Sequence, residues 1–181
     1  LAEAIGTTPD HFVKGDQTHT ANVRVVTEDD MRKGITRDRD YSDVDGLITN
    51  VPGIVLVTLH ADCVPIYFLD PEKKAIGMTH AGWRGTVQEI ARVTVESMKN
   101  TYGSDPADII CAIGPSICQN CYEVGQDVAD EFYKVMPGIT DKILRDDKNG
   151  HYHLNLWEAN KQVLLSEGIV EGNISVSGIS T

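Results

Sequence analysis

The stretch IVLVTLHADCVPIYFLDPEKKAIGMTHAGWRGT, residues 54–86, contains three apolar runs of strand length separated by short polar segments. The runs Ile54–Leu59 and Val64–Leu69 are rich in β-branched and aromatic residues, which favour strands, and the shorter run Ala75–Thr79 follows them. A turn sequence with Pro at its second position, Asp70–Lys74, separates the last two runs. The stretch therefore predicts a buried strand followed by two strands joined by a hairpin.

A helix is predicted directly after these strands, opening at Thr86. Apolar residues recur at helical spacing from Val87 to Met98, and Gly103 supplies a C-terminal stop. The other predicted elements are strands at 22–26, 108–113, 151–156 and 174–176, helices at 128–136 and 157–167, and an exposed charged loop at 28–45. No repeat or linker interrupts this pattern, so residues 1–181 are predicted to form a single α+β domain and not a doubly wound parallel sheet.

The composition excludes several classes of protein. The formal net charge is −11, and an acidic surface repels a phosphate backbone, which argues against nucleic-acid binding. One or two local arginines could still hold a small anion. No apolar stretch approaches the roughly 20 residues of a membrane span, and the opening residues lack the pattern of a signal peptide. Four cysteines in a chain of this length favour a reducing, cytoplasmic setting.

Three short segments place potential metal ligands at the ends or edges of predicted strands. They are QTH at residues 17–19, HADC at 60–63 and HAGWRGT at 80–86. Two imidazoles and one thiolate, from His19, Cys63 and His80, suit zinc, which in catalytic sites keeps a fourth position open for water. Because the three residues are dispersed along the sequence, residue type alone leaves a core or surface role open for each of them.

These segments occur in the same order in the YfiH-type family, which the sequence resembles. The family is also called laccase-domain or polyphenol oxidase, and its members are described as purine nucleoside phosphorylases. The motifs are QTH (17–19), DGLIT (45–49), ADCVP (61–65), HAGWRGT (80–86), IGPSI (113–117) and YEVG (122–125). The resemblance covers residues 16–125, and the 17-residue spacing from Cys63 to His80 is highly specific. Compared with the family pattern, the single domain at 1–181 is expected to be trimmed at both ends, with part of the substrate pocket outside the sequence.

The resemblance implies a fold, a cofactor and an activity. The fold is a YfiH-like α+β single domain with mixed β-sheets packed between helices, also described as a CNF1-like cysteine hydrolase fold. Zinc would be held by His19, Cys63 and His80, with copper the less favoured metal. The implied reaction is phosphorolysis of adenosine, inosine, guanosine and methylthioadenosine to base plus ribose 1-phosphate, and adenosine deamination is known in the family. The partners would be purine nucleosides and phosphate; the resemblance decides neither the preferred nucleoside nor the oligomeric state.

Two residues near these ligands are candidates for further catalytic roles. Deamination needs a carboxylate that moves protons, and Asp62, next to Cys63, is the candidate. Phosphorolysis needs a phosphate held at the anomeric carbon of an oxocarbenium-like sugar, and Arg84 is the candidate anion clamp. The predicted catalytic residues are thus Asp62, Cys63 and Arg84. Each has an alternative: Asp62 could orient a ligand histidine, and Arg84 could pair with one of the many carboxylates.

Two rival enzyme hypotheses use the same residues. Two histidines and one cysteine are also the ligands of blue copper, which suits the polyphenol oxidase (laccase) name, but six histidines are too few to add a further copper cluster. Cys63 as nucleophile and His80 as base would make a Cys/His hydrolase, active without a metal. A purely structural zinc is least favoured, because closed structural sites use four protein ligands.

Other histidines and cysteines are predicted to lie outside the metal site. His60 precedes the ADC motif and is interpreted as a non-ligand, while His151 and His153 are interpreted as structural or exposed. Cys118 and Cys121 form a C-x-x-C pair that is expected in a loop near the active site, and the sequence leaves their role open.

Overall fold

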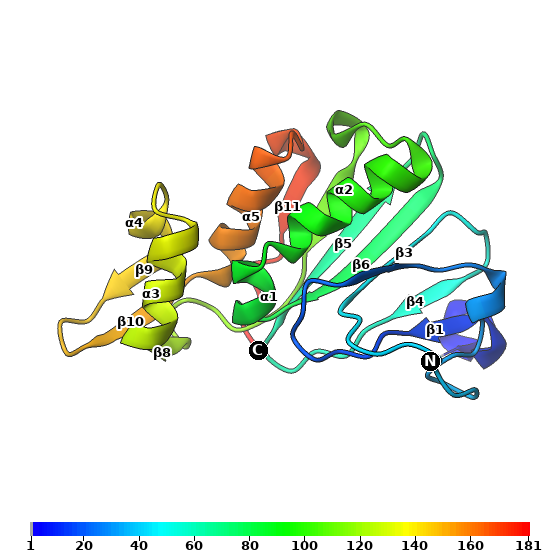
Figure 1. Cartoon of the computed structure of the whole chain (residues 1–181), viewed down its shortest axis with the longest axis horizontal. Coiled ribbons are helices and arrows are strands. Elements are labelled where there is room, and N and C mark those ends of the chain that lie inside the picture. The colour runs from blue at the N-terminus through cyan, green and yellow to red at the C-terminus, as the bar shows by residue number, and fades with distance from the viewer. Residues whose placement is uncertain (1) are drawn as a thin grey trace.

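A six-stranded mixed sheet forms the centre of the molecule (Figure 1), in a computed structural model that describes residues 2–181. Its strands are β2 (Val23–Val25), β3 (Gly46–Thr49), β5 (Val64–Asp70), β6 (Ala75–Ala81), β7 (Ile110–Ile113) and β11 (Ile174–Val176). The order across the sheet is β11-β7-β5-β6-β3-β2. The four inner strands pair antiparallel, and each outer strand pairs parallel with its neighbour. The predicted α+β class with mixed sheets is therefore confirmed.

The predicted hairpin between β5 and β6 is present and sets the geometry of the candidate site. Its turn is held by the Oδ1 atom of Asp70, which accepts hydrogen bonds from the amides of Glu72 and Lys73, each at 2.9 Å. The two strands then run back in register, with Pro65 opposite His80. Since Cys63 lies two residues before Pro65, the 17-residue spacing brings Cys63 to a position diagonal to His80 on the neighbouring strand.

Helices cover one face of this sheet (Figure 1). They are α1 (Trp83–Val87), α2 (Ile90–Tyr102) and α5 (Leu156–Ser166), and they pack side by side. Strand β5 shows the resulting two-sided burial, because Ile66 and Phe68 are buried in the core whereas Tyr67 and Leu69 are each 43% exposed. Burying alternate residues of a strand is what covering only one face of a sheet produces.

The helix predicted to open at Thr86 is two helices, and the prediction of its start is wrong. Helix α1 begins at Trp83, and Glu89 adopts a left-handed conformation with φ 56° between α1 and α2. The Glu89 amide donates to the carbonyl of Thr86 at 2.9 Å, a tighter turn than an α-helical one. A buried hydrogen bond of 3.0 Å from Asn160 Nδ2 to Thr86 Oγ1 ties α1 to α5.

The prediction that residues 54–59 form a buried strand is only partly right. Strand β4 spans Val55–Val57, is half-buried, and pairs in parallel with β1 (Phe12–Lys14) in a separate two-stranded sheet. Its neighbours Val13 and Ile54 belong to a small apolar cluster distinct from the main core. With a single pairing partner and a small core beneath it, β4 cannot be covered on both faces.

A third sheet and two further helices lie at the opposite end of the molecule from β1 and β4 (Figure 1). The strands are β8 (Glu123–Gly125), β9 (Leu144–Asp146) and β10 (His151–Leu154), and the helices are α3 (Gln126–Val135) and α4 (Thr140–Ile143). Short 3-10 turns occupy Glu3–Ile5, Pro9–His11, Glu28–Asp30, Pro106–Asp108 and Glu171–Asn173. Among residues 2–181, no helix combines the length and apolar character needed to cross a membrane.

The charged segment 28–45 is only partly the exposed loop that its composition predicts, because it also contains buried charged residues. Asp30 and Lys33 are buried within it, 2% and 4% exposed. One carboxylate oxygen of Asp30 bonds to Arg24 at 2.7 Å and to Lys33 at 2.8 Å, and Lys33 also pairs with Asp40. The guanidinium of Arg24 stacks on the ring of Tyr41, 4.3 Å from its centroid. Paired charges can be buried where isolated ones cannot, and this pairing orders the segment.

We expect Asp30 to make stability depend on acid pH. Burial raises the pKa of its carboxyl, but hydrogen bonds from Arg24, Lys33 and the Thr27 amide outweigh burial and lower the pKa from 3.8 to about 2. A lowered folded-state pKa stabilises the protein above pH 3.8, and this contribution disappears as the pH falls towards 2. The lowered pKa corresponds to about 2 kcal/mol of unfolding free energy.

Urea unfolding of Asp30→Asn between pH 7 and pH 2 measures this contribution. The variant should unfold more easily at pH 7 and should lose about 2 kcal/mol of the acid-dependent change. Asp29→Asn, on the exposed side of the same turn, is the control and should behave as the parent protein. Equal unfolding free energies for Asp30→Asn and the parent at pH 7 would contradict the assignment.

Candidate metal centre and its cavity

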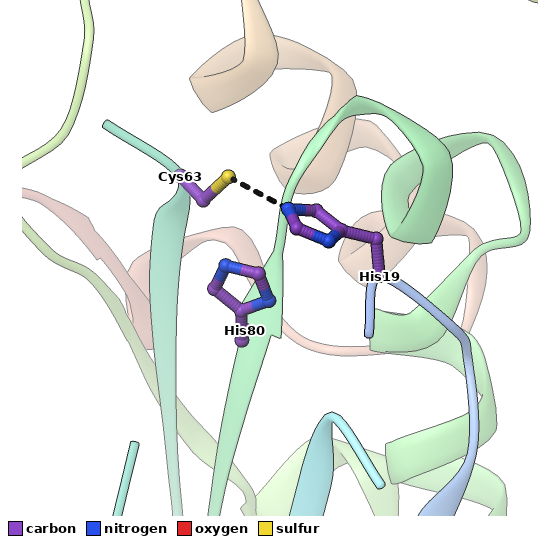
Figure 2. Close-up of side chains that lie close together, drawn as sticks. All are labelled: His19, Cys63 and His80. Atoms are coloured by element: carbon purple, nitrogen blue, oxygen red, sulfur yellow. Dashed lines mark hydrogen bonds between the residues drawn. The ribbon is translucent and has the colours of Figure 1, made fainter. Parts of the chain in front are cut away.

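The three residues predicted as metal ligands lie together, as Figure 2 shows. His19 comes from the loop before β2, Cys63 immediately precedes β5, and His80 lies on β6. One ligand atom from each residue lies within 4.8 Å of the other two, and Cys63 Sγ is 3.9 Å from His19 Nε2. The residues are 61 positions apart in sequence at their extremes, so the cluster is a product of the tertiary structure.

A buried carboxylate, Asp45, organises this cluster. It is completely buried at the start of β3, and its Oδ1 atom lies 2.8 Å from Nδ1 of His80. Its two oxygens also accept hydrogen bonds from three successive amides, those of Thr18 (3.1 Å), His19 (3.0 Å) and Thr20 (2.9 Å), and from the Thr20 hydroxyl (2.9 Å). Because Nδ1 of His80 faces Asp45, its Nε2 atom is the one left for a ligand.

The same contacts stabilise an uncommon backbone conformation at His19. Its φ is 67°, in the left-handed region that residues other than glycine rarely adopt. The hydrogen bonds from the amides at 18–20 to Asp45 hold the loop in this shape. The carboxylate therefore positions both histidines, one through its ring and the other through its backbone.

Hydrogen bonding determines the charge state of Asp45 and His80. Burial raises the pKa of Asp45, but hydrogen bonds from His80, from the Thr18 and Thr20 amides and from the Thr20 hydroxyl lower it to about 2. Burial lowers the pKa of His80, but its hydrogen bonds with Asp45 and Cys63 raise it to about 9. Asp45 is thus ionised at neutral pH, the state in which it can accept all of these hydrogen bonds.

Two neighbouring side chains fix the loop that carries Cys63. The amide group of Gln17 donates to the Leu59 carbonyl and accepts from the Leu59 amide, both at 2.7 Å. His60 Nδ1 lies 3.2 Å from the Cys63 carbonyl, and its Nε2 lies 2.8 Å from the hydroxyl of Thr58. Burial lowers the pKa of His60 to about 4. Both ring nitrogens of the neutral His60 have hydrogen-bond partners, so His60 supports the loop. This agrees with its interpretation as a histidine that does not bind the metal.

The glycine at position 82 is required by the close approach of the cluster. A Cβ atom there would lie 2.8 Å from Cys63 Sγ and 3.0 Å from His19 Cδ2. Its φ of −69° suits any residue, so the constraint is space and not backbone conformation. This explains why HAGWRGT has glycine two residues after His80.

The cluster opens into a cavity of about 530 Å³. Its lining includes His19, Cys63, His80, His60, Ala61, Asp62, Leu59, the segment 14–17 and Arg39. A volume of this size is in the range of small-molecule sites, and the metal-ligand candidates lie at its wall. The arrangement can therefore bring a bound small molecule next to the three donors.

Of the two other predicted catalytic residues, Asp62 lies on the cavity wall and Arg84 lies outside the cavity lining. Asp62 is exposed on the cavity wall, and its Oδ1 atom accepts a 2.9 Å hydrogen bond from the Thr181 hydroxyl. The carboxylate that orients a ligand histidine is Asp45 and not Asp62. Arg84 is exposed on α1, and its guanidinium stacks 4.3 Å from the centroid of the Trp83 ring, outside the cavity lining.

The sequence motifs gave no role to three residues at or near the candidate site, which are Asp45, Lys14 and Arg39. Asp45 is the first residue of the DGLIT motif, and a carboxylate directly before an apolar strand was a usable signal. Lys14 and Arg39 line the cavity but lie outside all the motifs, Arg39 within the segment interpreted as an exposed loop. Lys14 and Arg39 are 25 positions apart, and no sequence pattern of that spacing predicts that two cations lie in the same cavity.

The remaining candidates lie outside the cavity lining. His151 is exposed and its Nδ1 atom lies 3.2 Å from Glu123, while His153 Nδ1 lies 3.1 Å from the Gln119 carbonyl. Cys118 and Cys121 occur as free thiols in the loop between β7 and β8. The interpretation of the two histidines as structural or exposed agrees with these contacts.

The donor set fits a metal ion. Imidazole nitrogens and a thiolate are the ligands that zinc takes in tetrahedral sites, with ligand atoms about 3.5 Å apart for the usual bond lengths. The observed separations of up to 4.8 Å need only small side-chain movements to reach that arrangement. The cluster could therefore hold a metal, and the same donor set is also compatible with copper.

The whole chain, residues 1–181, matches the family model described as "multi-copper polyphenol oxidoreductase laccase". Purine nucleoside phosphorylase YlmD of Bacillus subtilis (strain 168) is 38% identical over 185 residues, covering 100% of this chain and 65% of that protein. Adenosine deaminase RL5, from an unknown prokaryotic organism, is 38% identical over 175 residues, covering 96% and 66%. The crystal structure of the Bacillus licheniformis hypothetical protein YfiH superposes with a TM-score of 0.95 at 39% identity, covering 99% and 67%. The chain thus spans about two thirds of the length of these relatives.

Replacing the organising carboxylate should weaken metal binding. We expect Asp45→Asn to lower zinc affinity about 10- to 100-fold, as found for residues that orient metal ligands, because an amide cannot accept all the hydrogen bonds made by the carboxylate. Zinc titration against a chelating indicator measures the change, with circular dichroism as the check of folding. Asp43→Asn is the matched control, because exposed Asp43 bonds the same loop through the Thr18 hydroxyl. Equal zinc affinity in the two variants would refute the role of Asp45.

Filling the space at Gly82 should also weaken metal binding. Gly82→Ala would push a methyl group against Cys63 Sγ and the His19 ring, and overpacking of this kind costs about 1–3 kcal/mol, or about 5- to 150-fold in affinity. Gly138→Ala is the control, since nothing lies within 4 Å of a Cβ at that position. The zinc titration should separate the two variants, and unchanged affinity in Gly82→Ala would show that the cluster tolerates the methyl group.

Proposed function

We propose that this chain, which belongs to the family described as multi-copper polyphenol oxidoreductase laccase, is a zinc-dependent purine nucleoside phosphorylase. The observation that carries the proposal is the convergence of His19, Cys63 and His80 on the wall of a cavity large enough for a small molecule. Relatives named purine nucleoside phosphorylase, 38% identical in one case, support the substrate class.

The proposed reaction exchanges one bond at the anomeric carbon of the nucleoside. The C1′–N bond breaks, and its electron pair leaves with the purine. A phosphate oxygen forms the new bond to C1′, and a proton moves from phosphate to the released base. The products are the free base and ribose 1-phosphate, and no oxidant or reductant is consumed.

The residues of the chain take distinct parts in this proposal. His19, Cys63 and His80 would hold the metal, which when bound supplies a Lewis acid next to the substrate. Asp62, exposed on the cavity wall, would hold or move the proton that the leaving base requires. Arg84 as an anion clamp stays a prediction, since its guanidinium lies on Trp83.

Adenosine deamination is the second candidate activity, and the relative named adenosine deaminase favours it. In that reaction water adds at C6 of the purine and ammonia leaves. The same carboxylate, Asp62, would transfer the proton. Adenosine, inosine, guanosine and methylthioadenosine are the proposed nucleoside substrates for phosphorolysis.

One feature of the geometry favours a rival without metal. Asp45 bonds Nδ1 of His80, and a ligand atom of Cys63 lies within 4.8 Å of one on His80, which is the order of groups in a cysteine hydrolase. Such a relay has no use for His19, yet the fold places His19 Nε2 3.9 Å from Cys63 Sγ. Activity that survives complete chelation of metal would favour the hydrolase, and activity that is lost on chelation and restored by zinc would favour the phosphorylase.

The proposal predicts phosphate-dependent release of base. Metal-quantified protein should convert adenosine to adenine and inosine to hypoxanthine only when phosphate is present, with about one zinc per chain. Cys63→Ala should lose both the zinc and the activity, because it removes one of three ligands. Chromatography of the bases measures the reaction.

Cys121→Ala is the matched control, since it removes an exposed thiol outside the cavity lining. It should keep both zinc and activity. If zinc-loaded, folded protein releases no base from either nucleoside, the phosphorylase proposal is wrong. Release of inosine from adenosine without phosphate would support the deaminase alone.

A further inference from the structure

We propose that Lys14 and Arg39 form the subsite for inorganic phosphate, in the cavity that also contains His19, Cys63 and His80. The inference rests on the proposed phosphorolysis and assigns the anion-binding role within it. Both cations belong to the lining of the 530 Å³ cavity, so an anion bound by them shares one cavity with the three metal-ligand candidates.

Lys14 is held in place by its backbone, while its ammonium has no partner among the described residues. It is the last residue of β1; its amide donates to the Lys33 carbonyl at 3.0 Å, and its carbonyl accepts from the Tyr41 hydroxyl at 2.8 Å. The residue is half-buried. Within residues 2–181, no ion pair or hydrogen bond engages its ammonium, which leaves three donors for a ligand.

Arg39 reaches the same wall from another segment and is rigidly positioned. One terminal nitrogen pairs with Asp16 at 2.7 Å, and the other donates to the Gly15 carbonyl at 3.0 Å. A guanidinium carries five N–H donors, so these two contacts leave others for an oxyanion. Asp16 partly compensates the charge of Arg39, so the unpaired charge on this wall comes from Lys14.

The surroundings favour an anion at this wall over an extended nucleic acid. The protein as a whole carries a net charge of −11, so it repels polyanions, whereas two cations act locally. A second hollow of about 440 Å³ shares Lys14 and Arg39 with the first and adds Arg37 and Asp38 to its lining. The two cations thus lie where the two hollows meet, accessible from both sides.

Phosphate fits this pair better than it fits Arg84. Phosphate oxygens accept several charge-assisted hydrogen bonds at once, and the wall offers one ammonium and one fixed guanidinium. Arg84 lies on the Trp83 ring, outside the lining. In the proposed reaction, Lys14 and Arg39 would present the phosphate to the anomeric carbon of a nucleoside bound beside Cys63.

The test is the dependence of base release on phosphate concentration in Lys14→Met and Arg39→Lys. Met keeps the apolar stem of lysine and removes only the charge, so folding should be retained. Loss of one charge-assisted contact should raise the KM for phosphate about 10- to 100-fold, with the KM for inosine and the zinc content unchanged. Arg39→Lys keeps the charge but loses the fixed fork and should give a smaller increase.

Lys73→Met is the matched control, because Lys73 lies in the exposed turn between β5 and β6, and it should leave the KM for phosphate unchanged. An unchanged phosphate KM in Lys14→Met, in protein that is active, would overturn the subsite and leave the proposed function standing.

Direct binding separates the subsite from the reaction. Calorimetry with inorganic phosphate on zinc-loaded protein should show binding that Lys14→Met weakens about 10- to 100-fold, even if no base is released. No phosphate binding to the parent protein, or equal binding to the variant, would overturn the proposal. Adenosine 5′-monophosphate is titrated in parallel: if only its binding depends on Lys14, the subsite holds a substrate-borne phosphate and the inorganic-phosphate assignment is wrong.

Discussion

The candidate site depends on the hydrogen bonds that the buried carboxylate of Asp45 makes. It bonds the His80 ring and three successive amides of the loop that carries His19, so one side chain determines the positions of two donors. A completely buried carboxylate without partners would be costly, and these hydrogen bonds supply the compensation. The same hydrogen bonds therefore compensate the buried charge and hold the two histidines in position.

The third donor is brought in by the sheet. The β5–β6 hairpin places Pro65 opposite His80, so Cys63, in the loop two residues before Pro65, lies near the histidine. The absence of a side chain at Gly82 leaves room for the thiol and the His19 ring, because a methyl group there would be 2.8 Å from the sulfur. One strand residue, His80, and two loop residues, His19 and Cys63, thus form the His-Cys-His cluster.

The cavity links this cluster to the chemistry proposed for the chain. On one part of its wall are donors suited to a metal, and on another are Lys14 and Arg39, suited to an oxyanion. A phosphorylase must bring a neutral nucleoside and an anionic phosphate together, and a wall with both kinds of group meets that need. A laccase would need further copper sites, and a cysteine hydrolase would have no use for His19 beside its thiol.

The sequence by itself determined the class of fold and the β5–β6 hairpin, because apolar runs and a Pro-containing turn are local patterns. It also named His19, Cys63 and His80 as candidate donors, through motifs of high specificity. Only the tertiary structure showed that Asp45 orients the donors, that β4 belongs to a separate sheet, and that Lys14 and Arg39 face the cavity. Local sequence patterns also failed to predict the helix break at Glu89 and the buried ion pairs of segment 28–45. These features arise from contacts between residues far apart in the chain, whose energy depends on burial and pairing, and local sequence patterns do not encode which distant partner a charge will find.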